Sequence, residues 1–526
     1  MTTIAPFAAG SYLTTRNASQ LTALKTQLND LSTQLSSGLT AQTYGGLGGE
    51  RSTALGAQAT LSALNGYAAG ITAAQTRTNL AVTTLSQVAT LGTNVENSLA
   101  NGLQSTPPGQ SVTKTLAQNN LVGALDALNQ SYNGGYIFGG SNLTTRPVLD
   151  ADTILNGTAT QDGLKTIVQE QINADLGTEK NGRISQVGPT PEVVGNPKPS
   201  DTQISLTEDA SAQTKPAFGF ALAGVKLNSQ NTGGLAATYS GGNPASIAID
   251  TAKQPAVGDS MTITLNLPDG TSTALTLTAA TTADTKSTTS FAIGNSPAAT
   301  ASNLSTAIQN ALGSAASSTL TASATARASA NFFSASNSTV AAGTAPLRVT
   351  YDPTTKEPSY TVDTSGKTVI WYQGDASSSS ALSTQTVQVS ATNSIGVGAR
   401  ANDPGIQSLL AGLATVAISL PNSSDTNASA IYSAVTSQAQ ALLTPTGTNP
   451  NVQDTVTALS LASSQLSNAA STNTTIQNTL QTTLNGIEQA PTQEVVAKLL
   501  DMQTRLQASY QITSSLSKLS LVNYLS

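Results

Sequence analysis

Apolar residues recur every three or four positions near both ends of this sequence. One stripe runs through Leu21, Leu24, Leu28, Leu31 and Leu35 and closes at the letters SSG. This spacing places a single apolar edge on an α-helix, and the glycine favours the end of that helix. The pattern therefore predicts a helix that needs a partner along one side.

A longer stripe follows the glycine-rich letters YGGLGGE and continues from about Arg51 to Leu99. It predicts a helix of roughly 50 residues, about 75 Å long at 1.5 Å per residue. Helices of this length are typical of rods and coiled coils rather than of globular domains.

The C-terminal end repeats the pattern in mirror order. A long stripe runs from Val452 to Ile487, Pro491 interrupts it, and a second stripe runs from Val495 to Leu516. Two striped ends of matched length pair most economically with each other. Such pairing would bring both termini to one end of an elongated molecule and make the middle an insertion at the other end.

The middle of the chain has strand-like rather than helical periodicity. The letters SMTITLNLPDGTSTALTLTAA form two period-two runs around a turn at Pro268, Asp269 and Gly270, and a second such cluster contains Trp371. Between the two clusters, SPAATASNLSTAIQNALG favours a short helix. We expect an α+β or mostly β domain here.

The predicted fold is thus a mainly α elongated helical rod with an inserted domain. Its paired N- and C-terminal helices are coiled-coil-like, and the insertion is α+β or mostly β. We expect three parts: an inner terminal helix pair at 1–48 and 491–526, a helical rod domain at 49–188 and 396–490, and a solvent-exposed, β-rich insertion at 189–395.

Composition narrows the functional classes. The 526 residues include no Cys and no His, which excludes disulfides, Cys-ligated metals, Ser-His-Asp triads and His-ligated zinc. Only 10% of residues are charged, the net charge is -6, and no basic run is present to neutralise nucleic-acid phosphates. We expect no enzymatic activity, no cofactor, no metal and no nucleic-acid partner.

Four further features predict ordinary structure rather than special sites. The apolar run from Leu409 to Leu420 has 12 residues, too few for a membrane helix, which needs about 20. The first residues do not read as a cleaved signal peptide. Gly45, Gly46, Gly48 and Gly49 indicate a flexible turn, because no Lys-Ser/Thr follows as in a phosphate-binding loop. The acidic residues near predicted helices are expected on solvated faces: Asp126, Glu170, Asp175 and Glu179.

The C-terminal segment LQASYQITSSLSKLSLVNYLS carries more apolar residues than one stripe holds, including Ile512 and Leu519. At about 25 cal/mol per Å² of apolar surface, leaving several of them in water costs several kcal/mol. An ordinary intramolecular bundle is one solution. Neighbouring copies of the same chain are the simplest cover for the excess.

Four segments resemble a known family. They are LSTQLSSGL with the long helix after it, NGGYIFGGSNLTTRPV, GVGARANDPGIQSLL, and LQASYQITSSLSKLSLVNYL at the C-terminus. Together they resemble the bacterial flagellin family, and most closely its branch of hook-associated proteins 3, which join hook and filament. The resemblance covers about 1–150 and 395–526; YGGLGGERSTAL lacks the Asp-Asp pair common after the Ser-Gly in the family.

The resemblance implies a structural subunit of the bacterial flagellum that assembles by helical packing of its terminal helices. Implied partners are further copies, neighbouring axial proteins (a hook-associated protein and flagellin) and an export chaperone. Implied localisation is extracellular, on the flagellum, after export without a cleaved signal peptide. We expect no membrane partner.

Two other functions remain open at this point. A filament-forming flagellin of the same fold is the main alternative, and an enzyme carried in the insertion is a distant third. On the assembly hypothesis the interface residues are Leu21, Leu24, Leu28, Leu31, Leu35, Leu499, Leu506, Tyr510, Leu516 and Leu525.

Overall fold

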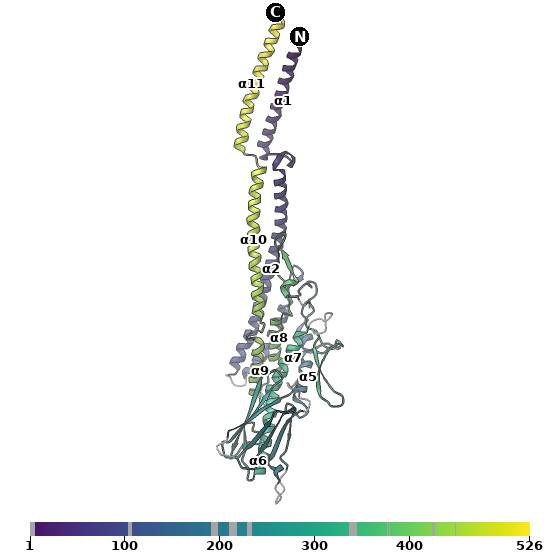
Figure 1. Cartoon of the computed structure of the whole chain (residues 1–526), viewed down its shortest axis with the longest axis vertical. Helices are drawn as coiled ribbons and strands as arrows, with labels where there is room; N and C mark the ends of the chain where they lie inside the picture. The colour runs from purple at the N-terminus through teal and green to yellow at the C-terminus, as the bar shows by residue number, and fades with distance from the viewer. Residues whose placement is uncertain are drawn as a thin grey trace. The chain divides into compact units, whose positions relative to one another are not determined.

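The computed structural model describes residues 6–103, 108–190, 198–209, 218–228, 234–335, 345–375, 377, 379–422, 425, 427–447 and 449–525. Within these, side chains are described except at 6–11, 13–14, 108–111, 516–517 and 519–525. The chain is a mixed α+β protein, as Figure 1 shows. It divides into two units: unit 1 comprises 1–74, 387–395 and 465–526, and unit 2 comprises 75–386 and 396–464.

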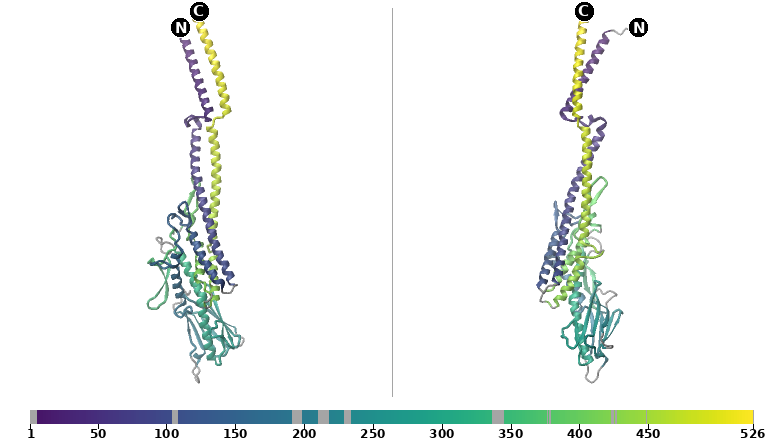
Figure 2. Two further views of the ribbon diagram at one scale, coloured as in Figure 1. Left: turned by 180° about the vertical axis from the view of Figure 1, so that it is seen from behind. Right: turned by 90° about the vertical axis from the view of Figure 1, so that its left-hand side faces the viewer.

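In unit 1, the terminal helices α1 (Pro6–Ser37) and α11 (Thr492–Leu525) lie side by side (Figures 1 and 2). Gly38 ends α1 with φ +71°, a conformation that glycine adopts without steric cost. Pro491 directly precedes α11, in agreement with the preference of proline for helix starts. Both predicted helix breaks are confirmed.

The two long helices are α2 (Arg51–Gly102, 52 residues) and α10 (Val452–Glu488, 37 residues). The predicted lengths are therefore confirmed. Their ends in unit 1 pack through the buried side chains of Ala54, Ala57 and Leu484.

The short strands β13 (Thr386–Gln388) and β14 (Ser394–Gly396) form a hairpin. The loop between these two strands is bound to α10: Nδ2 of the buried Asn473 donates to the Val389 carbonyl at 3.2 Å.

The glycine-rich turn before α2 is the 3₁₀ helix η1 (Tyr44–Glu50). Gly48 has φ +58°. A Cβ on Gly46 would lie 2.8 Å from the Cβ of Ala41, so only glycine fits there without movement. The predicted turn is confirmed. At two of its four glycines, Gly46 and Gly48, the backbone geometry disfavours any larger residue.

Unit 2 contains a helical part around one hydrophobic core. Its central helix, α8 (Pro404–Ser419), is buried on all sides from Leu409 to Val416. Phe333 and Trp371 meet edge to face in the same core, with ring centroids 5.4 Å apart. The unit 2 portions of α2 and α10 contribute to this core, together with α3 (Pro108–Ala127), α4 (Ala151–Asn156), α5 (Leu164–Leu176), α7 (Thr321–Ser334) and α9 (Ala428–Leu443). No described helix combines the length and apolar character needed to cross a bilayer.

A second core of unit 2 lies between two four-stranded sheets and α6 (Pro297–Ala315). One sheet has the order β10-β9-β8-β5 and the other β3-β4-β7-β6. The predicted hairpin around Pro268 is confirmed as β8 and β9. The strands are β3 (Ile184–Val187), β4 (Gln203–Glu208), β5 (Ala221–Asn228), β6 (Ala236–Ser240), β7 (Ser246–Asp250), β8 (Ser260–Asn266), β9 (Ser272–Ala280) and β10 (Ser290–Ala292).

The predicted short helix is confirmed as α6 but does not end where expected. It continues through a π-helical segment, η3 (Ala316–Leu320), into α7. Leu320 belongs to the sheet core, whereas Ala322 belongs to the helical core, so one continuous helical run joins the two cores. The remaining elements are the hairpins β1 (Ser131–Tyr132) with β2 (Gly135–Tyr136) and β11 (Leu347–Tyr351) with β12 (Pro358–Val362), and the 3₁₀ turns η2 (Pro199–Asp201) and η4 (Ala381–Thr384).

Candidate assembly interface

The predicted stripe on α1 forms one partly covered edge of that helix. Leu21, Leu24, Leu28 and Leu31 are half-buried, whereas the residues between them are exposed. Leu35, the last predicted position, is 39% exposed. Because α11 lies beside α1 within unit 1, the leucine edge accounts for the pairing of the two helices.

The stripe on α11 behaves in the same way. Val495 is buried, and Leu499, Met502 and Leu506 are half-buried. Tyr510 is 55% exposed, so its ring is not covered by the pairing. The side chains of Leu516 and Leu525 lie outside the described residues.

Apolar side chains also lie off the stripe of α11. At about 100° per residue, Val496, Leu500 and Tyr510 fall on one flank of the helix. Leu500 is 57% exposed, and Val496 is exposed as well. Fully burying one such side chain is worth about 1.5–3 kcal/mol, so this flank keeps a substantial unused driving force for association.

The four charges between Glu494 and Arg505 lie on the opposite flank of α11, whereas Lys518 falls on the same flank as Leu500. Lys498 pairs with Glu494 at 2.6 Å, and Arg505 pairs with Asp501 at 2.9 Å. The Lys498 ammonium also lowers the pKa of the Glu494 carboxyl. These exposed pairs add little stability, and no charged side chain lies on the apolar flank between Val496 and Tyr510. Ile512, 59% exposed, is an apolar residue on the charged flank.

A short backbone pairing ties the two helix breaks of unit 1 together. Thr40 N donates to the Glu488 carbonyl at 2.7 Å, and Ala490 N donates to the Gly38 carbonyl at 2.9 Å. Leu39 and Tyr44 beside this junction are each 39% exposed. The sequence signals the breaks, through Gly38 and Pro491, but not that they meet.

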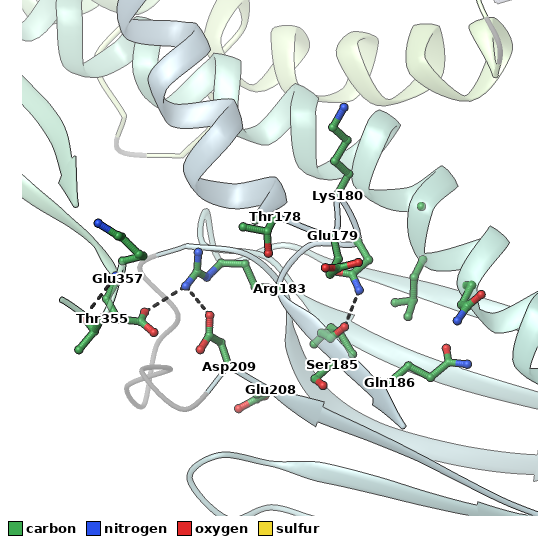
Figure 3. A pocket seen from close by; sticks show the side chains of 17 residues that line it. Thr178, Glu179, Lys180, Arg183, Ser185, Gln186, Glu208, Asp209, Thr355 and Glu357 are labelled. Atoms are coloured by element: carbon green, nitrogen blue, oxygen red, sulfur yellow. Dashed lines mark hydrogen bonds and ion pairs between the residues drawn. The ribbon is translucent and has the colours of Figure 1, made fainter. Parts of the chain in front are cut away.

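A surface groove of about 840 Å³ in unit 2 is lined mainly by polar and charged side chains (Figure 3). Arg183 lies between two acids in it, with Nη2 3.0 Å from Glu357 Oε2 and also paired with Asp209. The lining holds three basic and four acidic side chains, so its charges nearly balance, and no nucleophile in it is placed against a base. In the described part of the chain, no three acidic side chains gather as a metal site would require.

The predicted solvated carboxylates are not all solvated. Asp126 and Glu179 are exposed as expected. For the other two the prediction is wrong: Glu170 is half-buried and paired with Arg348, and Asp175 is fully buried and paired with Arg327. Both arginines come from segments more than 150 residues further along the chain, so local sequence carries no sign of them.

No protein-family model matches the chain, and no curated protein matches its sequence significantly.

Proposed function

We propose that the chain is a non-enzymatic structural subunit of the bacterial flagellum, the junction protein between hook and filament. Its terminal helices would pack against those of neighbouring copies and of adjoining axial proteins. The filament-forming flagellin of the same family is the alternative. Export without a cleaved signal peptide, with the help of a chaperone, belongs to the same proposal.

One observation carries this proposal. Between Val496 and Tyr510, helix α11 has an apolar flank without a charge, formed by Val496, Leu500 and Tyr510, beyond the edge that faces α1. A helix that needed only one partner would gain nothing from a second apolar side. The segments that resemble the flagellin family include this same helix.

The proposed mechanism is helical polymerisation. Heterologous contacts, in which one flank of a subunit meets a different surface of the next, propagate along an axis instead of closing into a ring. In this proposal α1 and α11 form the inner pair, α2 and α10 form a rod, and the β-rich part faces outward. The apolar area covered by neighbours offsets the entropy lost on ordering the terminal helices.

A pair of matched substitutions tests the interface. Leu500→Asp places a charge on the apolar flank, and Ala508→Asp places the same charge on the charged flank of the same helix. We expect Leu500→Asp to be exported but to fail in assembly, while Ala508→Asp assembles normally. Loss of assembly with both variants, or with neither, would contradict the role of this flank. A chain lacking 505–526 should likewise be exported and not assemble.

The position of the protein on the flagellum separates junction protein from filament subunit. Antibody labelling confined to the hook tip supports the junction role. Labelling along the whole filament would overturn it in favour of flagellin.

A further inference from the structure

Charged residues are rare in this chain, yet they gather around α5. Five of the seven ion pairs among the described residues lie there. We call this group the root cluster. It consists of Arg183, Arg327 and Arg348 with Asp162, Glu170, Asp175, Asp209 and Glu357.

The root cluster lies where the chain leaves the helical part of unit 2 for the sheets and where it returns. The outgoing segment is α5 and the loop to β3, which contains Arg183; the returning segments are α7 with Arg327 and β11 with Arg348. Arg348 binds both Asp162, at 2.9 Å, and Glu170. In Figure 3, Arg183 joins Asp209 at the end of β4 to Glu357 beside β12.

Asp175 is the innermost member. Its side chain is 0% exposed and pairs with Arg327 of α7. Its Oδ1 accepts from Gly219 N at 3.2 Å and from Gln171 Nε2 at 3.4 Å. The carboxylate thus joins α5, α7 and the segment before β5. Tyr360 of β12 is linked to them, since its Oη accepts from Arg327 at 2.9 Å and donates to Gln171 at 2.9 Å.

We propose that the root cluster is a proton-sensitive latch that fastens the two ends of the β-rich part to α5, with Asp175 as the group that senses pH. Opening the root would expose Asp175 to water, while the closed root keeps it dry. The proposal concerns unit 2 alone and does not depend on a flagellar role.

The charge state of Asp175 decides the direction of the response. Burial raises its pKa from 3.8 to about 6, although Arg327 opposes the shift. A raised pKa in the closed state means that closure is favoured in acid and weakens as pH rises through about 6. The other ionisable groups facing Asp175 are Arg327, Arg183, Tyr351 and Tyr360, and burial raises the pKa of both tyrosines above 10; the chain has no His.

Hydrogen exchange of the full chain tests the latch. We expect the opening equilibrium of amides in 164–183 and 218–222, corrected for intrinsic exchange, to rise about tenfold from pH 5 to pH 7.5. Asp175→Asn should remove this pH dependence. Glu179→Gln, which neutralises an exposed carboxylate of the same loop, should retain it.

Two results would overturn the proposal. One is wild-type opening that is constant or falls over this pH range; the other is an unchanged slope in Asp175→Asn. If Asp175→Asn does not fold, Tyr360→Phe replaces it. That variant loses the hydroxyl between Arg327 and Gln171, so opening should increase at every pH while the pH slope stays. A Tyr360→Phe variant that opens no more than wild type contradicts the latch.

Discussion

At the scale of single residues, the effect of replacing a helical glycine depends on what packs against it, which the surrounding sequence does not reveal. Gly405 and Gly313 both lie inside helices, α8 and α6. A Cβ on Gly405 would lie 2.3 Å from the backbone carbon of Asn451, whereas a Cβ on Gly313 would meet nothing within 4 Å. Local sequence does not distinguish the two glycines, because the difference is made by a partner segment.

We therefore predict opposite effects from the same substitution. Gly405→Ala should lower the free energy of unfolding of unit 2 by about 1–3 kcal/mol, because the Asn451 backbone must move. Gly313→Ala should raise it by up to about 1 kcal/mol through helix propensity. Urea unfolding monitored by Trp371, the only Trp, measures both. Equal changes in the free energy of unfolding would show that the close approach of Asn451 to Gly405 does not oppose an added methyl group.

At the scale of elements, the helices were predictable and their junction was not. The 3-4 spacing and the terminators Gly38 and Pro491 specify where α1 and α11 end and begin. The same letters say nothing of the backbone hydrogen bonds between Gly38–Thr40 and Glu488–Ala490. α7 was missed for a related reason. Its sequence TASATARASANFFS is mostly Ala, Ser and Thr and shows no leucine-like stripe. These small residues are nevertheless buried, because several other elements pack against the helix.

The junction can be tested at Gly38. Gly38→Ala should weaken it by about 1 kcal/mol, since alanine resists φ +71°. Gly38→Asn should be better tolerated, because asparagine adopts the left-handed conformation more readily. Amide exchange at Thr40 and Ala490 provides the measurement: it should be faster in the alanine variant than in the asparagine variant. The reverse order would contradict the account.

At the scale of the whole molecule, the two cores of unit 2 decide which part of the chain can be removed. Seven residues of the predicted insertion at 189–395 belong to the helical core: Ala322, Ala328, Phe332, Phe333, Val369, Trp371 and Tyr372. The outgoing and returning chains come close near Gly182, where an added Cβ would lie 3.1 Å from Leu320. A short linker can therefore replace the sheets without stretching the chain.

We predict that replacing 183–319 with a short Gly/Ser linker leaves the helical core folded. Replacing 200–390 should unfold it, because that excision removes Phe332, Phe333 and Trp371 from the core. Circular dichroism and limited proteolysis compare the two variants. Equal loss of cooperative unfolding in both would mean that the helical part needs the sheets. Under the proposed flagellar role, restored motility with the first variant in cells lacking the native protein would show that the β-rich part has no essential activity.

The sequence by itself determined the elements with strong periodicity. The terminal helices, the two long helices, the hairpin at Pro268 and the helix α6 follow from apolar spacing and from Gly and Pro, which act within a few residues. Of the predicted leucines, Leu21, Leu24, Leu28, Leu31, Leu499 and Leu506 are half-buried, whereas Leu35 is exposed.

Tertiary structure decided everything that depends on residues distant in the chain. It buried Asp175 against Arg327, placed α7 in a core, and joined the helix breaks of unit 1. It also divided the apolar residues of α11 between an edge that α1 covers and a flank that stays exposed. The physical reason is the same in each case: burial and ion pairing depend on which partner arrives in space, and local spacing does not specify that partner.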